Sequence, residues 1–159
     1  MDTAKAHFLK KDLIPLLKST PPDATPRWGK LNVQQMIEHL ADSVRIAAGT
    51  FGDVPLFTPA EKLPKLQDFL LSETPLRENT KNPLVPDNPP LRFSSIAEAL
   101  NDLQTALDAF FERFYNNESQ TTRNPFFGEL NFDLNIRFLY KHAVHHLRQF
   151  GVAVTPNRV

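Results

Sequence analysis

Apolar side chains recur at helical spacing in four segments of the chain, and this pattern predicts four main helices. The first is expected over residues 3–17, with Pro15 disturbing its last turn, and the second over residues 33–48. The third is expected over residues 95–115 and the fourth over residues 131–149. No segment shows the alternation of apolar and polar residues that is typical of a strand, so the pattern indicates an all-α fold.

Side chains with capping potential mark the starts of two of these helices. Asn32 with Gln35, and Ser95 with Glu98, have the spacing of a capping box. The third helix also carries apolar residues spaced alternately by four and three, which is the pattern of a seam between packed helices. They are Ile96, Leu100, Leu103, Leu107, Phe110 and Phe114. The seam suits packing within one chain and pairing of two copies, so a homodimer is expected as an alternative to a monomer.

Residues 50–93 form a proline-rich crossover that contains eight of the chain's 14 prolines. A short helix is expected over residues 59–71, and the rest of the crossover is expected to be extended. Its phenylalanines and leucines predict that it is ordered and packs on the helices, and a flexible insertion is the alternative. The expected architecture is a single domain over residues 1–159, a four-helix bundle with this crossover between its second and third helices.

Composition narrows the class of protein. The 18 basic residues equal the 18 acidic residues in number, and this balance disfavours a nucleic-acid-binding protein. The chain has no cysteine, so it has neither disulfides, nor thiolate zinc sites, nor a thiol nucleophile of its own. No basic and apolar leader begins the chain, and no apolar run is long enough to span a membrane. These features predict a soluble cytoplasmic protein without a membrane partner.

Three of the chain's five histidines lie close together in the fourth predicted helix, at positions 142, 145 and 146. His142 and His146 are one helical turn apart, so their side chains point the same way. On a helical wheel Asn135 and Gln149 share their face, whereas His145 lies toward the solvent side. Two imidazoles placed in this way can bind one metal ion if the fold supplies a further ligand.

The further ligand must come from another helix, and His7 and His39 are the two candidates. His39 lies mid-way along the second predicted helix and beside its apolar stripe, a position that suits a site at the rim of a bundle. His7 lies in the first turn of the first helix and is expected to be exposed. The predicted metal ligands are His39, His142 and His146, and the predicted supporting or pocket-lining residues are Gln149 and Asn135.

Histidines on helices are more often exposed or hydrogen-bonded within the fold than bound to a metal, so a site without metal is the alternative. Because Ala143 follows His142, the H-E-x-x-H motif of zinc proteases is absent. Imidazole ligands suit both nickel and zinc, and these are the two ions expected, with water or a small-molecule substrate completing the shell.

The spacing H-x-x-x-H-x-x-Q near the end of the last helix, with one histidine mid-way along the second, resembles the DinB-like metal-binding superfamily, in an uncharacterised bacterial branch. The resemblance lies in His39, His142, His146 and Gln149, and in residues 26–30, 62–65, 78–81 and 141–151. It implies a four-helix bundle that holds a divalent ion with three histidines. Related members include bacillithiol S-transferases and mycothiol-dependent maleylpyruvate isomerase, which implies a metal that activates an external low-molecular-weight thiol.

The resulting functional hypothesis is a divalent-metal-binding protein with a three-histidine site, expected to act as a thiol S-transferase or a related hydrolase. An ion held by three neutral imidazoles keeps its double positive charge and lowers the pKa of a bound thiol or water. No residue is assigned to thiol recognition. A non-catalytic metal-binding or stress-associated protein and a plain helical interaction module therefore stand as alternatives.

Overall fold

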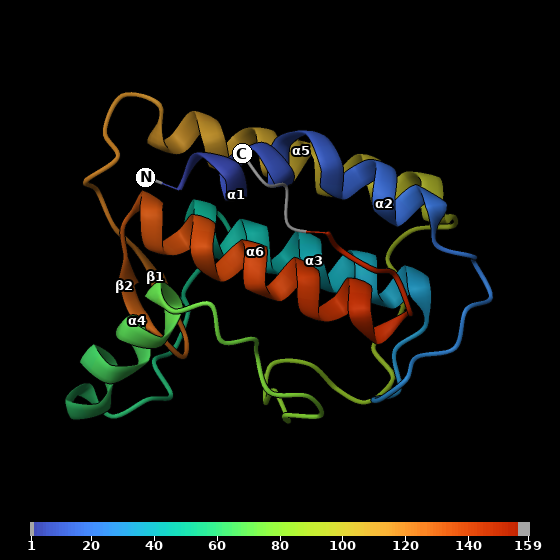
Figure 1. The fold of residues 1–159 in the computed structure, drawn as a ribbon, viewed down its shortest axis with the longest axis horizontal. Coiled ribbons are helices and arrows are strands. Elements are labelled where there is room, and N and C mark those ends of the chain that lie inside the picture. Colours follow the sequence, from blue (N-terminus) through green and yellow to red (C-terminus); the bar gives the residue numbers. More distant parts are fainter. Residues whose placement is uncertain (1, 156–159) are drawn as a thin grey trace.

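The computed structural model describes residues 2–155, which are mostly helical with one small two-stranded sheet (Figure 1). The helices are α1 (Thr3–His7), α2 (Leu13–Ser19), α3 (Val33–Ala48), α4 (Leu63–Leu71), α5 (Ile96–Phe114) and α6 (Phe132–Gln149). A π-helical turn, η1 (Phe8–Asp12), joins α1 to α2, and a 3₁₀ turn, η2 (Ala60–Lys62), precedes α4. The strands are β1 (Thr122–Asn124) and β2 (Gly128–Leu130). Within residues 2–155, no helix is long and apolar enough to cross a bilayer.

The segments predicted to be helical are helical. The N-terminal helical segment, α3, α5 and α6 run alongside one another (Figure 1). α3 packs closely on α5, and α6 contacts both α3 and the N-terminal segment. Asn32 and Gln35 form the complete capping box that was predicted before α3. Before α5 only half of the predicted box forms: the Ser95 hydroxyl accepts the Glu98 N–H, but the Glu98 carboxylate accepts the N–H of Ser94 and not that of Ser95. Local sequence signals therefore set where these helices begin.

The effect of Pro15 differs from the prediction. Pro15 lies inside α2, and the helix continues beyond it to Ser19. The irregularity comes earlier, at η1, where the Leu13 N–H bonds the Phe8 carbonyl five residues before it. Proline has no N–H to donate, and its ring crowds the carbonyl four residues before it. A wider π-helical turn ahead of the proline accommodates that crowding without ending the helix.

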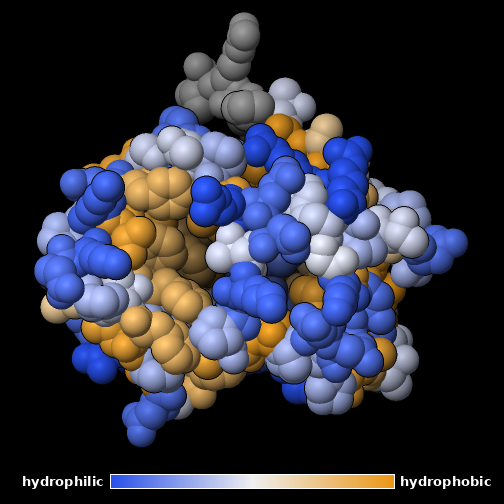
Figure 2. Space-filling model, turned by 90° about the horizontal axis from the view of Figure 1, so that it is seen from below, coloured by the Kyte–Doolittle hydropathy of each residue, from blue (hydrophilic) through white to orange (hydrophobic). Residues whose placement is uncertain are grey.

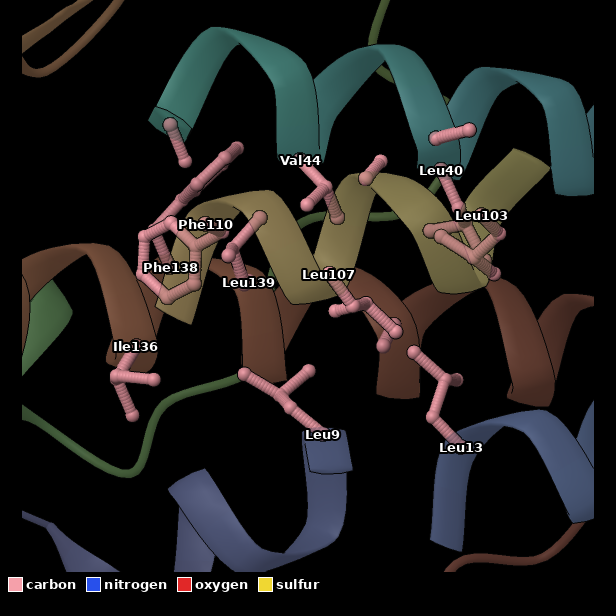
Figure 3. Packing of buried hydrophobic residues seen from close by; sticks show 14 of the residues in the cluster. Leu9, Leu13, Leu40, Val44, Leu103, Leu107, Phe110, Ile136, Phe138 and Leu139 are labelled. Atoms are coloured by element: carbon pink, nitrogen blue, oxygen red, sulfur yellow. The ribbon is translucent and has the colours of Figure 1, made fainter. Parts of the chain in front are cut away.

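The core lies between the N-terminal segment, α3, α5 and α6. Figure 3 shows Leu103 and Phe110 of α5 packed toward α3, where Val44 projects, while Leu9 approaches from the N-terminal segment. Leu103 and Phe110 are 0% exposed. The apolar seam of α5 is therefore used for packing inside the chain.

A β-hairpin follows α5, although no strand was predicted. β1 pairs antiparallel with β2, with Thr122 opposite Leu130. The Asn124 carboxamide oxygen accepts the backbone N–H groups of Phe126 and Phe127, and this closes the turn. Strands of three residues are too short to show alternation, so the sequence pattern could not reveal them.

The crossover of residues 50–93 packs against the helices and the hairpin at several points. The Phe57 N–H donates to the Pro125 carbonyl, and the Gln67 amide donates to the Phe127 carbonyl. The Lys141 ammonium of α6 donates to the carbonyls of Ser72 and Thr74. Backbone groups of this proline-rich segment thus find partners on the hairpin and on α6 that they lack within the segment.

Glu38 of α3 holds the end of the crossover. Its side chain is 4% exposed, and its carboxylate oxygens accept the N–H groups of Arg92 and Phe93 at 3.0–3.3 Å. We expect Glu38→Ala to lower the free energy of unfolding by about 2 kcal/mol, because buried N–H groups lose a charged acceptor. Urea unfolding measures this, with Glu61→Ala at an exposed position as the control. Equal stability of both variants would contradict this role for Glu38.

Candidate metal centre

Two helices bring three imidazoles together. α6 supplies His142 and His146, one turn apart, and α3 supplies His39 from the opposite side. The Nε2 atom of His142 lies 3.0 Å from Nε2 of His39 and 3.0 Å from Nε2 of His146. The ligand atoms of the three residues all lie within 4.8 Å of one another. The three predicted ligands therefore form one cluster that can hold a metal ion.

Burial keeps these imidazoles neutral. His142 and His146 are 9% and 6% exposed, and His39 is partly exposed. Burial lowers the pKa of His39 to about 4, and it lowers the pKa of His142 and of His146 well below the usual value. Protonation of a neighbouring imidazole would repel a proton on His142, and this repulsion lowers the pKa of His142 further. All three rings are uncharged near neutral pH, which is the state in which a nitrogen lone pair can bind a metal.

Gln149 fixes the orientation of His146. The Nδ1–H of His146 donates to the Gln149 side-chain oxygen at 2.7 Å, and the Gln149 amide donates to the Trp28 carbonyl at 2.8 Å. The Arg27 N–H returns a bond of 2.7 Å to the Gln149 carbonyl. With its proton on Nδ1, His146 presents the Nε2 lone pair to the other two histidines. Gln149, predicted to support or line the site, is thus hydrogen-bonded to one of the three histidines.

The close approach of residues 27–29 to α6 requires a glycine. Gly29 has a φ of +74°, and a Cβ atom at this position would lie 3.0 Å from the Gln149 amide nitrogen. The sequence reasoning did not assign Trp28 or Gly29 to the site. The single tryptophan, followed by a glycine just before α3, could have marked this turn as a candidate part of the site. Only the fold shows that the turn contacts the C-terminal end of α6.

Asn135 lies elsewhere on α6. It is 1% exposed, and its amide donates to the Thr122 hydroxyl at 3.0 Å and to the Leu130 carbonyl at 2.9 Å. These bonds attach both strands of the hairpin to α6. Asn135 therefore supports the hairpin, and no hydrogen bond joins it to the three histidines in the described structure.

The two remaining histidines stay outside the cluster. His7 is exposed, as the sequence indicated. His145 is half-buried, packs its ring on Trp28 at 5.3 Å and bonds the backbone of Leu76 in the crossover. Phe138, one turn before His142, stacks on that imidazole with ring centroids 5.5 Å apart. The i, i+4 spacing of Phe138 and His142 could have placed this contact from the sequence.

The pKa values predict how the stability of the metal-free protein depends on pH. In the unfolded chain these histidines titrate near about 6.5. In the fold, burial lowers the pKa of His39 to about 4 and lowers those of His142 and His146 well below their usual value. Below about pH 6.5 the unfolded state therefore binds more protons, and stability is lost as pH falls.

We expect each of the three histidines to contribute a loss of about 1 kcal/mol between pH 7 and pH 5.5. Urea unfolding in the presence of a chelator measures the loss. The slope with pH should be shallower in His39→Ala and unchanged in His7→Ala, which removes an exposed histidine. A slope that is the same in all three proteins would contradict the assignment.

Comparison of the chain with protein-family models, curated proteins and solved structures finds no match. Function must therefore be argued from the geometry of His39, His142 and His146 and of the groups around them. The described structure thus contains a cluster of three neutral histidines, two of them buried, that is held by two helices, braced by Gln149 and able to bind a metal ion.

Proposed function

We propose that this protein binds one divalent metal ion through the Nε2 atoms of His39, His142 and His146, in the manner of the DinB-like superfamily that its sequence resembles. The observation that carries the proposal is the position of His142 Nε2, which lies 3.0 Å from each of two other Nε2 atoms. The protons available on three neutral rings cannot satisfy both contacts.

The position of the proton on His146 limits the hydrogen bonds that the three rings can form. Its Nδ1 carries the proton bonded to Gln149, so its Nε2 carries only a lone pair. If His142 Nε2 is protonated it can donate to His146, but it then has no lone pair for His39. If it is unprotonated, it faces the lone pair of His146. At most one of the two contacts is therefore a full hydrogen bond in any neutral arrangement, and a cation among the three lone pairs would satisfy all of them.

The spacing of the nitrogen atoms supports the same conclusion. Ligand atoms about 2.1 Å from an ion and about 90° apart are separated by about 3.0 Å, and by about 3.4 Å at the tetrahedral angle. The separations of 3.0 Å at His142 fit ligands at adjacent corners of such a shell. Three imidazoles with further positions open to water or substrate suit nickel or zinc.

Three protein ligands are typical of a catalytic metal site, whereas structural sites usually have four. We therefore favour a metal-dependent enzyme in which an external thiol or water binds the ion and becomes a nucleophile near neutral pH. Because the chain contains no cysteine, the thiol of an S-transferase would come from a small molecule. A non-catalytic protein, whose ion ties α3 to α6, is the second candidate, because the ligands come from both helices.

A cobalt titration tests the metal site. The metal-free protein should bind one equivalent of Co²⁺ with a visible absorption spectrum, and His39→Ala should weaken binding at least about tenfold, as expected for loss of one ligand. His7→Ala is the control and should bind like the native protein. Sub-stoichiometric binding, or unchanged affinity in His39→Ala, would refute the site.

The same cobalt protein separates the two candidate functions. Adding 2-mercaptoethanol to an open site should produce the intense near-ultraviolet band of a cobalt–thiolate bond. If neither this thiol nor azide changes the spectrum, the ion has no exchangeable position, and the non-catalytic candidate should be preferred.

A further inference from the structure

Large apolar side chains are exposed on the crossover next to the hairpin. Phe51, Leu56 and Phe57 are 44%, 38% and 46% exposed, and we call these residues the apolar patch. Figure 2 views the molecule from the side on which the crossover lies, and it shows a hollow lined by apolar side chains on that face. Large apolar groups gathered at a hollowed surface are characteristic of a ligand-binding site.

A series of aromatic contacts joins the apolar patch to the metal centre. Phe57 stacks on Phe126 with ring centroids 5.6 Å apart. The next residue, Phe127, packs on Phe138 at 5.5 Å, and Phe138 stacks on His142 at 5.5 Å with an angle of 13° between the rings. The hairpin and α6 thus form an aromatic wall that runs from an exposed surface to an imidazole of the cluster.

Backbone bonds hold the outer end of this wall in place. The Phe57 N–H donates to the Pro125 carbonyl at 2.8 Å, and the Thr58 hydroxyl donates to the Phe126 carbonyl at 2.8 Å. The exposed ring of Phe57 is therefore held beside the hairpin before any ligand binds. Such pre-organisation reduces the entropy that a ligand would lose on binding.

The chemistry at the inner end of the wall defines the other part of the ligand. The three candidate ligands are imidazoles, which bind a metal as neutral groups, so a bound divalent ion keeps its full double charge in a partly buried setting. An anionic donor is the group that such an ion binds most strongly. The wall offers aromatic faces and no charge, which favours a flat apolar group.

We propose that the apolar hollow is the substrate-binding surface, and that the substrate is a small molecule with an anionic metal-binding head and an aromatic or similarly apolar body. This inference rests on the proposed metal site, because the head group needs the ion. The body lies along the wall formed by Phe57, Phe126 and Phe138, and the head binds the ion beside His142.

Two hydroxamates with the same head group test the inference on cobalt-loaded protein. Benzohydroxamate carries a phenyl ring and acetohydroxamate carries a methyl group. Titrations followed by the visible cobalt spectrum should give at least tenfold tighter binding of benzohydroxamate to the native protein. In Phe57→Ala this ratio should fall at least threefold, with acetohydroxamate binding unchanged. Tyr115→Ala, which removes an exposed aromatic ring from the end of α5, should keep the native ratio.

The outcomes distinguish the two proposals. Failure to bind cobalt would overturn the metal site itself. Cobalt binding with equal affinity for the two hydroxamates, or with a preference that Phe57→Ala leaves unchanged, would overturn the apolar substrate and leave the metal site in place. Concentration-dependent self-association of the native protein that Phe57→Ala abolishes would also overturn it, because the patch would then be covered by a second copy.

Discussion

Phe110→Ala is expected to lower the free energy of unfolding by about 3–5 kcal/mol, the largest effect of any substitution considered. Phe110 is 0% exposed and contacts three other phenylalanine rings. Its ring centroid is 5.2 Å from those of Phe111 and Phe114 and 5.7 Å from that of Phe132. Alanine removes these contacts and leaves a cavity that neighbouring rings, fixed on two helices, cannot fill.

Urea unfolding followed by circular dichroism measures the change. Tyr115→Ala is the matched control, because it removes an aromatic ring that is 79% exposed at the end of the same helix. The control should change stability by less than about 0.5 kcal/mol. A loss below about 1 kcal/mol for Phe110→Ala, with an unchanged dependence on urea, would show that the Phe110 contacts contribute little to the core.

The double variant with His142→Ala and His146→Ala is expected to lose metal binding almost completely. It removes two of the three ligand atoms that lie within 4.8 Å of one another and leaves only His39. Affinity for Co²⁺ or Zn²⁺ should fall by a factor of about 10⁴ or more, because a single imidazole cannot compete with water for a divalent ion.

Metal analysis after dialysis against a limiting ion measures this loss. The variant with His145→Ala is the matched control, because His145 is a neighbouring residue on the same helix whose ring bonds the crossover and packs on Trp28. It should retain one equivalent of metal. Full metal content in the double variant would show that the ion is bound elsewhere.

The sequence predicted the clustering of the three histidines from their positions on two helices. The spacing of His142 and His146 fixes their common direction on any helix, and His39 lies on a helix with a strong cap. Asn135 shows the limit of the same reasoning. A helical wheel discards distance along the axis, and Asn135 lies about 10 Å from His142 along α6, at about 1.5 Å per residue. It shares their direction but reaches the hairpin.

Features that depend on contacts between distant segments could not be predicted. The carboxylate of Glu38 reads as a solvated charge on a helix, yet it is 4% exposed and binds the backbone of residues 92–93. The hairpin is held by hydrogen bonds from Asn135 and from the crossover. Its three-residue strands are too short to be predicted from their own sequence. Both sets of contacts depend on where the crossover lies in the fold, and the spacing of apolar residues along the sequence does not reveal that position.

The turn that braces Gln149 gives the protein a built-in optical reporter. Trp28 is the single tryptophan of the chain, and its carbonyl holds the side chain that orients His146. Its indole also packs on His145, whose ring lies 5.0 Å from that of His146. The tryptophan fluorescence of the protein therefore comes from an indole that contacts His145, which in turn contacts the candidate ligand His146. Occupancy of the cluster can be followed in the unlabelled protein, with any ion, including those that have no colour.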